Sequence, residues 1–321
     1  MKRNILLALL TLGMIACGAS TALAAEVPPL VSTKWVAEKL DTLKTPGQTK
    51  IRLVEVGAKY GEGHIPGAVQ VKFPSEVFDP ETDHMVVGLP EIERVLKSLG
   101  VTPGTHIVLY DGDGQPHQVS RFYWTLKYWN VERVSLMDGG KTLWEKENRP
   151  LTKDVPNVKR MNFEVKYPPN TKIRAMYSPH IVNALATGDP VILDCRAEKF
   201  FKGEVFSVDK WVRTGHLPGA LNVFSMASVN GDREFKSKEE LQKMYSEKGI
   251  TPDKKIIAYC DTGVLASHAW FVLNDLLGYK NVSVYDGSMR EYANRFDTPM
   301  EPGTVYEKFP KTPIQKLEGK Q

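Results

Sequence analysis

The sequence predicts an α/β protein built from two copies of one unit, each a mostly parallel sheet flanked by helices. Two observations lead to this prediction. Four short motifs of the first half recur in the second half in the same order. In both halves, short apolar runs alternate with segments of helical periodicity. Such runs are typical of strands buried on both faces of a parallel sheet, and their alternation with helices is typical of α/β domains.

The repeat is the stronger of the two observations. Residues 63–68, Gly-His-Ile-Pro-Gly-Ala, return as Gly-His-Leu-Pro-Gly-Ala at 215–220. The other three pairs are 99–103 with 248–252, 107–111 with 256–260, and 134–140 with 282–288. One match arises easily by chance, but four in one order do not. The period greatly exceeds the roughly 20–50 residues of a solenoid repeat, so the motifs indicate two duplicated domains.

Helix signals stand between the apolar runs. In the first half, Pro90 opens a segment with apolar residues on one face, and Gly100 ends it. In the second half, residues 241–245 carry the equivalent apolar face, and Gly249 ends that segment. Proline at a helix start and glycine after a helix end are the usual boundary residues. In open parallel sheets of this kind, functional sites form at the carboxyl ends of the strands.

Residues 1–24 are predicted to be a cleaved secretory signal peptide, which implies a periplasmic location. Two basic residues precede the apolar run 5–16, and the Ala-x-Ala pattern 22–24 follows it. This order is typical of export signals, and the apolar run is too short to span a bilayer. A minor alternative is lipid attachment at Cys17, because residues 14–17 loosely resemble a lipoprotein cleavage site.

The remaining chain divides into two domains and a tail. We expect the first domain at 25–151, the second at 178–302 and the tail at 303–321. The segment 152–177 is rich in Pro, Lys and Asn and is predicted to be the linker. No segment after the signal is long and apolar enough to span a membrane.

Charge and cysteine content exclude several classes of protein. Loss of Lys2 and Arg3 leaves 42 − 2 = 40 basic residues against 38 acidic residues. This near balance gives no reason to expect a nucleic acid or an anionic membrane as a partner. Only Cys195 and Cys260 remain, so the core must form by packing rather than by a disulfide framework. The oligomeric state is left open, with a monomer expected.

Cys260 is the best candidate for a functional residue. It follows the apolar run 256–259 and opens the loop 260–266, after which a long apolar segment extends to Leu277. This order predicts a strand, a tight loop and a helix. Loop N–H groups and the positive end of a helix both favour the thiolate, which is the nucleophilic form of cysteine.

These residues together resemble the rhodanese family, specifically its two-domain sulfurtransferases, over about residues 30–302. Four features carry the resemblance: the Gly-His-Ile/Leu-Pro-Gly-Ala turn in each half, strand-borne Glu55 and Asp194, the Cys260 loop, and the Asp-Gly-x repeats near each domain end. The resemblance implies two tandem rhodanese-like domains. It also implies that only the second is catalytic, because Asp111 occupies the position of Cys260 in the first.

The resemblance implies a sulfurtransferase with a two-step mechanism. The Cys260 thiolate takes the outer sulfur of a small anionic donor, thiosulfate or 3-mercaptopyruvate, and becomes a persulfide. A thiol or cyanide acceptor then removes this sulfur. Such covalent catalysis gives ping-pong kinetics, and the mechanism requires no metal or organic cofactor.

The same resemblance suggests residues that bind the donor. Arg196 matches an arginine that holds the donor's anionic end, and the alternative is a structural ion pair. Arg213 is a second, weaker candidate. Thr262 lies where mercaptopyruvate-type members carry a serine. Its hydroxyl either relays a proton, holds the donor, or only bonds its own backbone in the loop. Gly263 and Val264 match the family loop.

Two loop residues depart from the family pattern. Thiosulfate-type members carry cations in this loop, whereas Asp261 brings the opposite charge, which raises the pKa of a neighbouring thiol. Leu265 replaces the usual Thr or Arg. The loop is therefore closer to the mercaptopyruvate type but fits neither type well, and the sequence leaves the donor open.

Three further residues carry weaker hypotheses. His64 and Glu55 match a His–Asp pair of mercaptopyruvate-type enzymes and form a possible acid–base relay, although the turn around His64 is mainly structural. Cys195 is predicted to be either a small core thiol or a resolving thiol that forms a disulfide with Cys260.

Two other functions compete with sulfur transfer. Rhodanese-related phosphatases and arsenate reductases require an arginine in the loop, and residues 261–266 contain none. The more serious alternative is a non-enzymatic periplasmic carrier of sulfur or selenium, or a rhodanese module that docks partners. The unusual residues Asp261 and Leu265 keep this alternative open.

Overall fold

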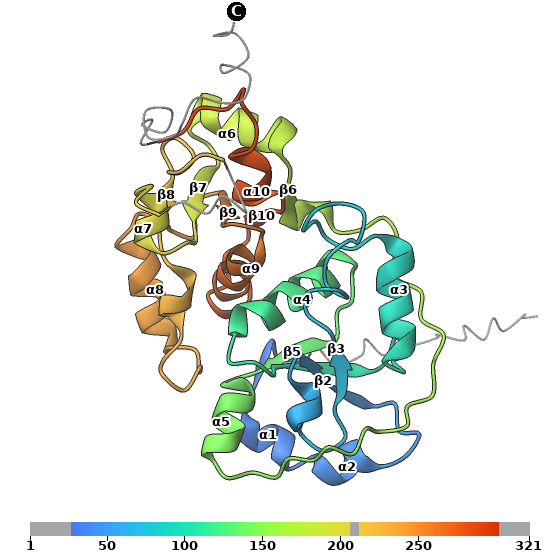
Figure 1. The fold of residues 1–321 in the computed structure, drawn as a ribbon. Helices are drawn as coiled ribbons and strands as arrows, with labels where there is room; N and C mark the ends of the chain where they lie inside the picture. Colours follow the sequence, from blue (N-terminus) through green and yellow to red (C-terminus); the bar gives the residue numbers. More distant parts are fainter. Residues whose placement is uncertain (1–26, 206–211, 302–321) are drawn as a thin grey trace, which may run out of the picture.

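The computed structural model describes residues 27–205 and 212–301 (Figure 1). The predicted signal peptide, Cys17 and the predicted tail lie outside the described residues. Within the described residues, no helix combines the length and the apolar content that crossing a membrane requires.

Two parallel sheets of five strands each confirm the predicted α/β duplication. The first sheet has the order β1-β5-β4-β2-β3 and the second the order β6-β10-β9-β7-β8, so strand n of the first half corresponds to strand n + 5 of the second. Every pairing within both sheets is parallel. The strands of the first sheet are β1 Leu30–Val31, β2 Ile51–Val56, β3 Val69–Val71, β4 His106–Asp111 and β5 Val134–Met137. Those of the second are β6 Arg174–Ala175, β7 Val191–Asp194, β8 Leu221–Asn222, β9 Ile256–Tyr259 and β10 Val282–Tyr285.

Helices cover both faces of each sheet. The first half has α1 Thr33–Ala37, α2 Leu40–Lys44, η1 Tyr60–Glu62, α3 Leu89–Ser98, α4 Pro116–Tyr128 and α5 Gly140–Lys146. The second half has η2 Thr171–Ile173, η3 Tyr177–Ile181, α6 Val182–Thr187, α7 Glu198–Phe201, η4 Ser225–Ser228, α8 Lys238–Ser246, α9 Val264–Trp270, η5 Phe271–Leu276 and α10 Ser288–Tyr292. The two helices predicted from boundary residues are α3 and α8. A capping box in which Ser237 and Glu240 bond each other's backbone begins α8.

The central strands are the most deeply buried part of each half. Every residue of β4 and β9 is buried, as the apolar runs predict. Because β9 lies between β7 and β10, the carboxyl end of β9 is enclosed on both sides by neighbouring strands. The residue after β9 is Cys260, which the sheet therefore places at the centre of its carboxyl edge.

The second sheet begins within the segment that was predicted to be linker. Arg174 and Ala175 form β6, which pairs with β10. The extended connection therefore ends before residue 174 rather than at 177. A two-residue edge strand leaves little apolar pattern in the sequence, which explains why composition alone marked these residues as linker.

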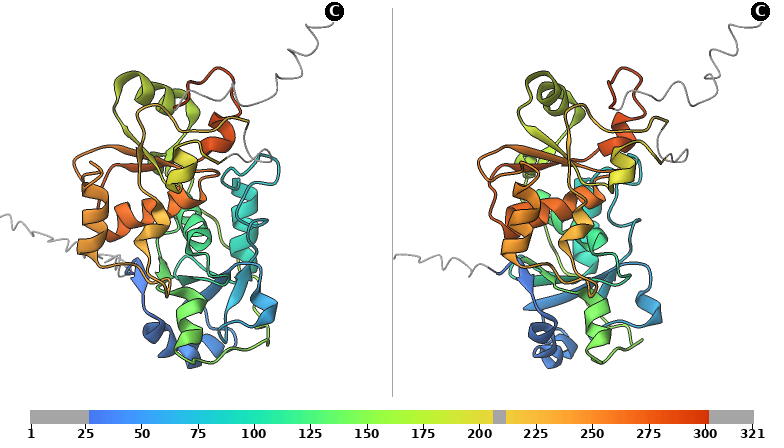
Figure 2. Two further views of the ribbon diagram at one scale, coloured as in Figure 1. Left: turned by 60° about the vertical axis from the view of Figure 1, so that its left-hand side comes forward. Right: turned by 90° about the vertical axis from the view of Figure 1, so that its left-hand side faces the viewer.

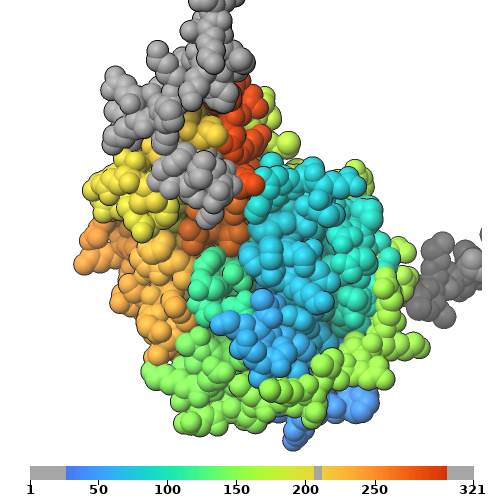
Figure 3. Space-filling view, viewed as in Figure 1, coloured from blue at the N-terminus to red at the C-terminus, as the bar shows by residue number. Residues whose placement is uncertain are grey.

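The two halves pack against each other through α4 and α9. Figure 1 shows both helices between the two sheets, and they remain side by side in both views of Figure 2. In the space-filling view, the two halves are in direct contact (Figure 3). Helix α4 is buried on nearly all sides, from Val119 to Leu126, because it faces its own sheet and the second half at once. The helix after the Cys260 loop thus lies against the first half.

Candidate active site

The fold places Cys260 at the turn from β9 into α9. The thiol side chain is buried, with 1% of the residue exposed. Gly263 precedes α9 with φ = 78°, a left-handed conformation that glycine adopts at little cost. The predicted strand, loop and helix are therefore present, and the helix begins at Val264 rather than at Ser267.

The segment 286–290, which leads from β10 into the first turn of α10, holds the backbone of Cys260. The Cys260 N–H donates to Ser288 Oγ at 3.1 Å. In return, the Met289 N–H donates to the Cys260 carbonyl at 3.0 Å, and the Arg290 N–H donates to the Asp261 carbonyl at 2.9 Å. The segment 286–290 contains the Asp-Gly-Ser copy of the Asp-Gly-x repeat, at residues 286–288. The repeat thus marks the segment that fixes the position of the nucleophile.

The sulfur is subject to opposing electrostatic effects. Burial raises the pKa of Cys260, and the charge of Asp261 raises it further. Hydrogen bonds from the backbone of Ala266, Thr262 and Leu265 lower it. The loop N–H groups thus act as expected from the sequence, but burial outweighs them, so the net direction is upward.

Replacement of Asp261 tests this balance. In Asp261→Asn, we expect the pKa of Cys260 to fall because the carboxylate no longer repels the thiolate. More thiolate is then present at pH 8, so alkylation of Cys260 by iodoacetamide accelerates several-fold. The measurement is the alkylation rate between pH 6 and 10, followed by peptide mass spectrometry. Asp253→Asn, which changes an exposed acid of the same half, is the control; identical profiles for Asp261→Asn and wild type would contradict the expectation.

Arg196 lies beside the loop in a buried ion pair with Asp194. Its Nε and Nη2 donate to the Asp194 carboxylate at 3.0 and 2.6 Å, and Nη2 also donates to the Gly215 carbonyl at 2.8 Å. Its Nη1 lies 3.9 Å from Asp261 Oδ1. The structural ion pair is therefore present, and Nη1 is the part of the guanidinium that points toward the Cys260 loop.

Arg213 is held by backbone carbonyls of the same half. Its guanidinium donates to the carbonyls of Ala293 at 3.1 Å, Thr298 at 2.5 Å and Tyr292 at 3.0 Å, and also bonds Arg295. This arrangement favours a structural role, because these carbonyls hold the guanidinium against the end of the second half.

The other predicted loop residues lie as the loop geometry requires. Thr262 and Asp261 are half-buried, whereas Gly263 and Val264 are buried. Thr262 therefore presents part of its side chain at the surface of the site. A side chain at position 263 would meet Arg121 Nη1 at 2.7 Å, so the structure demands glycine there.

The structure does not bring His64 and Glu55 together as a hydrogen-bonded pair. His64 stacks on Tyr60, and its ring nitrogens lie 3.1 and 3.2 Å from the carbonyls of Tyr60 and Asp154. Glu55 instead accepts a hydrogen bond from the Tyr110 hydroxyl at 2.6 Å. Burial raises the pKa of Glu55 to about 7.

The second half repeats the arrangement around His64, which explains why the same Gly-His-Ile/Leu-Pro-Gly-Ala turn occurs in both halves. His216 stacks on Phe201 and bonds its carbonyl at 2.8 Å. Tyr259 donates to Asp194 at 2.6 Å, as Tyr110 does to Glu55. Both turns therefore share one structural network, which supports the mainly structural interpretation of the turn.

The corresponding position in the first half has no nucleophile. Asp111 ends β4 and is buried, and burial raises its pKa to about 6. A side chain at Gly140, the counterpart of Ser288, would meet the Asp111 carbonyl at 2.9 Å. Gly140 has no hydroxyl, so the hydrogen bond that Ser288 accepts from the Cys260 N–H has no counterpart at Asp111.

Cys195 lies next to Cys260 at the sheet edge. Asp194 pairs with Tyr259, so the residues that follow them, Cys195 and Cys260, are neighbours on adjacent strands. Both thiols are free and buried. Burial raises the pKa of Cys195 well above the ordinary value of a thiol, and the charge of Cys260 adds to this effect. The resolving-thiol role of Cys195 stays a prediction.

Sequence analysis missed two buried groups beside the loop. Arg121 of α4 and Asp286 after β10 form an ion pair of 2.5 Å between the two halves. Asp286 belongs to the repeated Asp-Gly-x motif, which marks its position but not its partner. Arg121 carries no sequence signal, because it lies within a helix whose neighbours are unknown until the halves are packed together.

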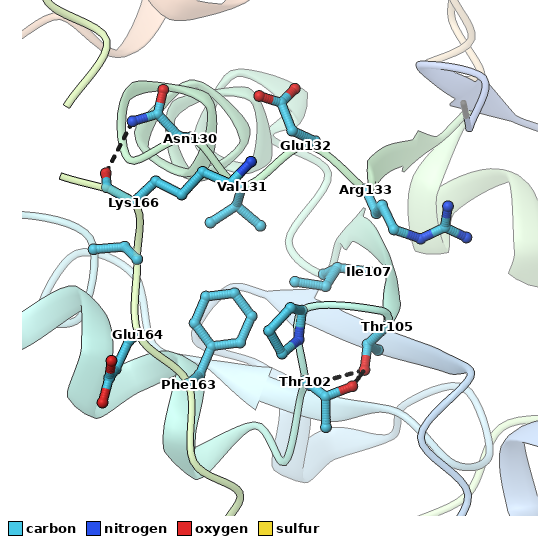
Figure 4. A pocket seen from close by; sticks show the side chains of 12 residues that line it. Thr102, Thr105, Ile107, Asn130, Val131, Glu132, Arg133, Phe163, Glu164 and Lys166 are labelled. Carbon is cyan, nitrogen blue, oxygen red and sulfur yellow. Dashed lines mark hydrogen bonds between the residues drawn. The ribbon is translucent and has the colours of Figure 1, made fainter. Parts of the chain in front are cut away.

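Figure 4 shows a cavity of about 480 Å³ whose lining includes none of these residues. It is lined by Thr102, Pro103, Thr105, Ile107, Asn130, Val131, Glu132, Arg133, Phe163, Glu164, Val165 and Lys166. Ile107 is at the start of β4, so the cavity opens at the amino edge of the first sheet. Among the described residues, no group of three or more His, Cys, Asp or Glu side chains is arranged to hold a metal ion.

Comparison with known proteins agrees with this geometry. The family model described as "Rhodanese-like domain" matches the chain twice, at 33–147 and 179–295. A Haloferax volcanii protein named "Putative thiosulfate sulfurtransferase" is 37% identical over 281 residues, which cover 85% of this chain and 96% of the relative. The "Sulfur carrier protein TtuD" of Thermus thermophilus is 36% identical over 285 residues, which cover 85% of this chain and 96% of the relative.

Solved structures of EanB are similar to this chain along most of its length. Wild-type EanB aligns with a TM-score of 0.74 and 25% identity over 85% of this chain and 69% of its own. An EanB variant, solved as a cysteine persulfide in a tetrahedral intermediate state with ergothioneine, aligns with a TM-score of 0.73 and 25% identity over 85% of this chain and 70% of its own.

Proposed function

The chain belongs to the rhodanese family, and on this premise we propose that it transfers sulfane sulfur through a persulfide on Cys260. The observation that carries the proposal is the asymmetry between the halves. Both strands β4 and β9 end at the centre of a carboxyl edge, but only β9 is followed by a thiol, and the backbone of the loop after it lowers the pKa of that thiol. A carboxylate such as Asp111 does not form a persulfide.

The chemistry proceeds in two displacements at sulfur. The Cys260 thiolate attacks the outer sulfur of thiosulfate, a new S–S bond forms, and sulfite leaves with the electron pair of the broken bond. With 3-mercaptopyruvate, the broken bond is C–S, and the leaving carbon takes a proton to give pyruvate. An acceptor thiolate or cyanide then attacks the outer persulfide sulfur, and Cys260 leaves as the thiolate.

The loop N–H groups are the main stabilising feature in this scheme. The backbone N–H groups of Thr262, Leu265 and Ala266 lower the pKa of the Cys260 thiol. Preorganised donors of this kind stabilise negative charge as it develops during attack and on the persulfide. Arg196 Nη1 and the Thr262 side chain are the groups of this half that we assign to the donor.

Intact-protein mass spectrometry tests the proposal directly. Incubation with thiosulfate or 3-mercaptopyruvate is expected to add one sulfur to the protein, and peptide mapping is expected to place it on Cys260. Cyanide should then remove this sulfur as thiocyanate. If neither donor adds sulfur to a protein whose Cys260 is shown to be reduced, the assigned donors are wrong.

A specific observation also favours a second function, a carrier that passes sulfur or selenium to a protein acceptor. The Thermus relative is named a sulfur carrier protein. In addition, Asp261 opposes a dianionic donor beside the nucleophile. Sulfur that stays on Cys260 for hours with cyanide or small thiols, but leaves when a sulfur-accepting protein is added, would identify the carrier; rapid turnover with a small acceptor would identify the enzyme.

We also propose that the protein acts in the periplasm. The support for export is the basic and apolar pattern of residues 1–24 with its Ala-x-Ala site. Fractionation of cells that produce the full chain, with amino-terminal sequencing of the product, tests both the location and the cleavage site.

A further inference from the structure

The first half places an incompletely bonded cation against the Cys260 loop. Arg121 on α4 is fully buried, and one of its nitrogens, Nη2, donates to Asp286 Oδ1 at 2.5 Å. Its Nε and Nη1 are buried and have no hydrogen-bond partner among the described residues. Buried donors are nearly always satisfied, so two unsatisfied donors on one charged group call for an explanation.

Asp286 does not fully neutralise the Arg121 guanidinium, because the same carboxylate also pairs with Arg174. Arg174 donates to Asp286 Oδ2 at 3.0 Å, and the Val86 N–H donates to the same oxygen at 3.0 Å. Two guanidinium groups thus surround one carboxylate, which leaves this three-residue group with a net positive charge. Its low-dielectric surroundings allow that charge to act over several ångströms.

The unsatisfied side of Arg121 faces the loop that carries the nucleophile. A Cβ atom at Gly263 would lie 2.7 Å from Arg121 Nη1 and 3.2 Å from the Asp286 carbonyl. Gly263 is three residues after Cys260, and Asp286 begins the segment whose Ser288 and Met289 hold the Cys260 backbone. Arg121 therefore lies against Gly263 of the loop and bonds Asp286, which begins the segment that holds the Cys260 backbone.

The loop itself lacks such a charge. Residues 261–266 contain no Lys or Arg, and Asp261 is negative. Two arginines of the second half lie beside the loop, and both are paired: the Arg196 guanidinium bonds Asp194, and Arg290, whose N–H bonds the Asp261 carbonyl, pairs with Asp83 of the first half. The charge of each of these arginines is thus matched by a carboxylate, whereas the group of Arg121, Arg174 and Asp286, which lies against Gly263, has two cations for one carboxylate.

We propose that Arg121 is a specificity-determining residue of the Cys260 site, through which the first half supplies the positive charge that attracts an anionic sulfur donor and stabilises the persulfide anion. It acts across Gly263 by its field rather than by contact with the reacting sulfur. This inference rests on the proposed function of Cys260 and gives the half without a nucleophile a defined part in donor selection.

Paired alkylating agents test this proposal without sulfur transfer. Iodoacetate is an anion and iodoacetamide is neutral, so the ratio of their alkylation rates at Cys260 reports the electrostatic field at the sulfur. Looser packing would accelerate alkylation by both reagents and leave this ratio unchanged. In Arg121→Met, we expect the ratio of iodoacetate to iodoacetamide rates to fall about ten-fold, as loss of one nearby charge predicts. In Arg121→Lys, which keeps the charge, the ratio should stay within about three-fold of the wild type.

Arg174→Met is the matched control, because it removes the same charge from the same carboxylate but does not face Gly263. Its ratio should fall clearly less than that of Arg121→Met, because the Arg174 side chain is partly exposed and solvent screens its charge. Arg121→Gln serves as a second neutral variant if Arg121→Met does not fold. An unchanged ratio in a folded neutral variant, or an equal fall in Arg174→Met, would overturn the proposal.

Donor kinetics connect the inference to the reaction. The KM for thiosulfate, a dianion, should rise more in Arg121→Met than the KM for 3-mercaptopyruvate, which carries one carboxylate. An equal rise for both donors would count against selection by charge. If the wild type transfers sulfur from neither donor, the proposed function fails, whereas the alkylation ratio still decides the role of Arg121.

Discussion

Cys260→Ser is expected to abolish sulfur transfer, with a loss of at least about a thousand-fold in kcat/KM. A serine hydroxyl is nearly isosteric with the thiol, but it remains protonated near neutral pH and forms no persulfide. The change removes the nucleophile while Ser288 and Met289 still hold the backbone at position 260. The measurements are thiocyanate formation from thiosulfate and pyruvate release from 3-mercaptopyruvate, together with intact mass after each donor.

Cys195→Ala is the matched control for this experiment. Cys195 is the other thiol among the described residues, lies on the neighbouring strand and is equally buried. The Cys195→Ala variant should still acquire sulfur at Cys260 if Cys195 only packs in the core. Full transfer activity in folded Cys260→Ser would refute the persulfide mechanism, and sulfur found on Cys195 in that variant would move the nucleophile to the neighbouring strand.

Arg196→Met is expected to produce the largest loss of stability, about 3–5 kcal/mol in the free energy of unfolding. The guanidinium and Asp194 are both almost fully buried and bond each other at 2.6 Å. Removal of the cation leaves the carboxylate buried with only the Tyr259 hydroxyl and the backbone as partners. The measurement is urea denaturation followed by fluorescence, with the midpoint compared with that of the wild type.

Two comparisons show whether the loss comes from the unpaired carboxylate. Lys255→Met breaks an exposed pair with Asp189 and should cost no more than about 1 kcal/mol. The double variant Asp194→Leu with Arg196→Met removes both charges and should recover part of the lost stability. A loss below about 1 kcal/mol in Arg196→Met would mean that Asp194 is neutral or otherwise satisfied in the folded protein.

Much of the fold follows from patterns that are local in sequence. The apolar runs that became β4 and β9 and the boundary residues of α3 are each read within one segment, because side-chain periodicity and capping depend on near neighbours. The repeat then extends these local signals to a whole-domain statement. The two-residue strand β6 was missed because a short edge strand leaves almost no apolar pattern.

Some features of the candidate site could likewise be predicted from the sequence, and others could not. The position of Cys260 at the end of a central strand was predictable, and so was the opposing effect of Asp261 on its pKa. The direction of the total pKa shift was not, because burial depends on all the elements packed around the sulfur. The partners of Arg213 were also unpredictable, since they are backbone carbonyls about 80 residues later in the chain, such as Ala293.

The sequence by itself determined that this protein is a duplicated α/β chain of the rhodanese type with one thiol, Cys260, in its second copy of the strand–loop–helix unit. Only the tertiary structure decided what surrounds that thiol. Arg121 and Asp286 are 165 residues apart, and no spacing rule connects them. They meet because α4 packs on α9, an event governed by the shape and burial of two helix faces rather than by any pattern within one of them.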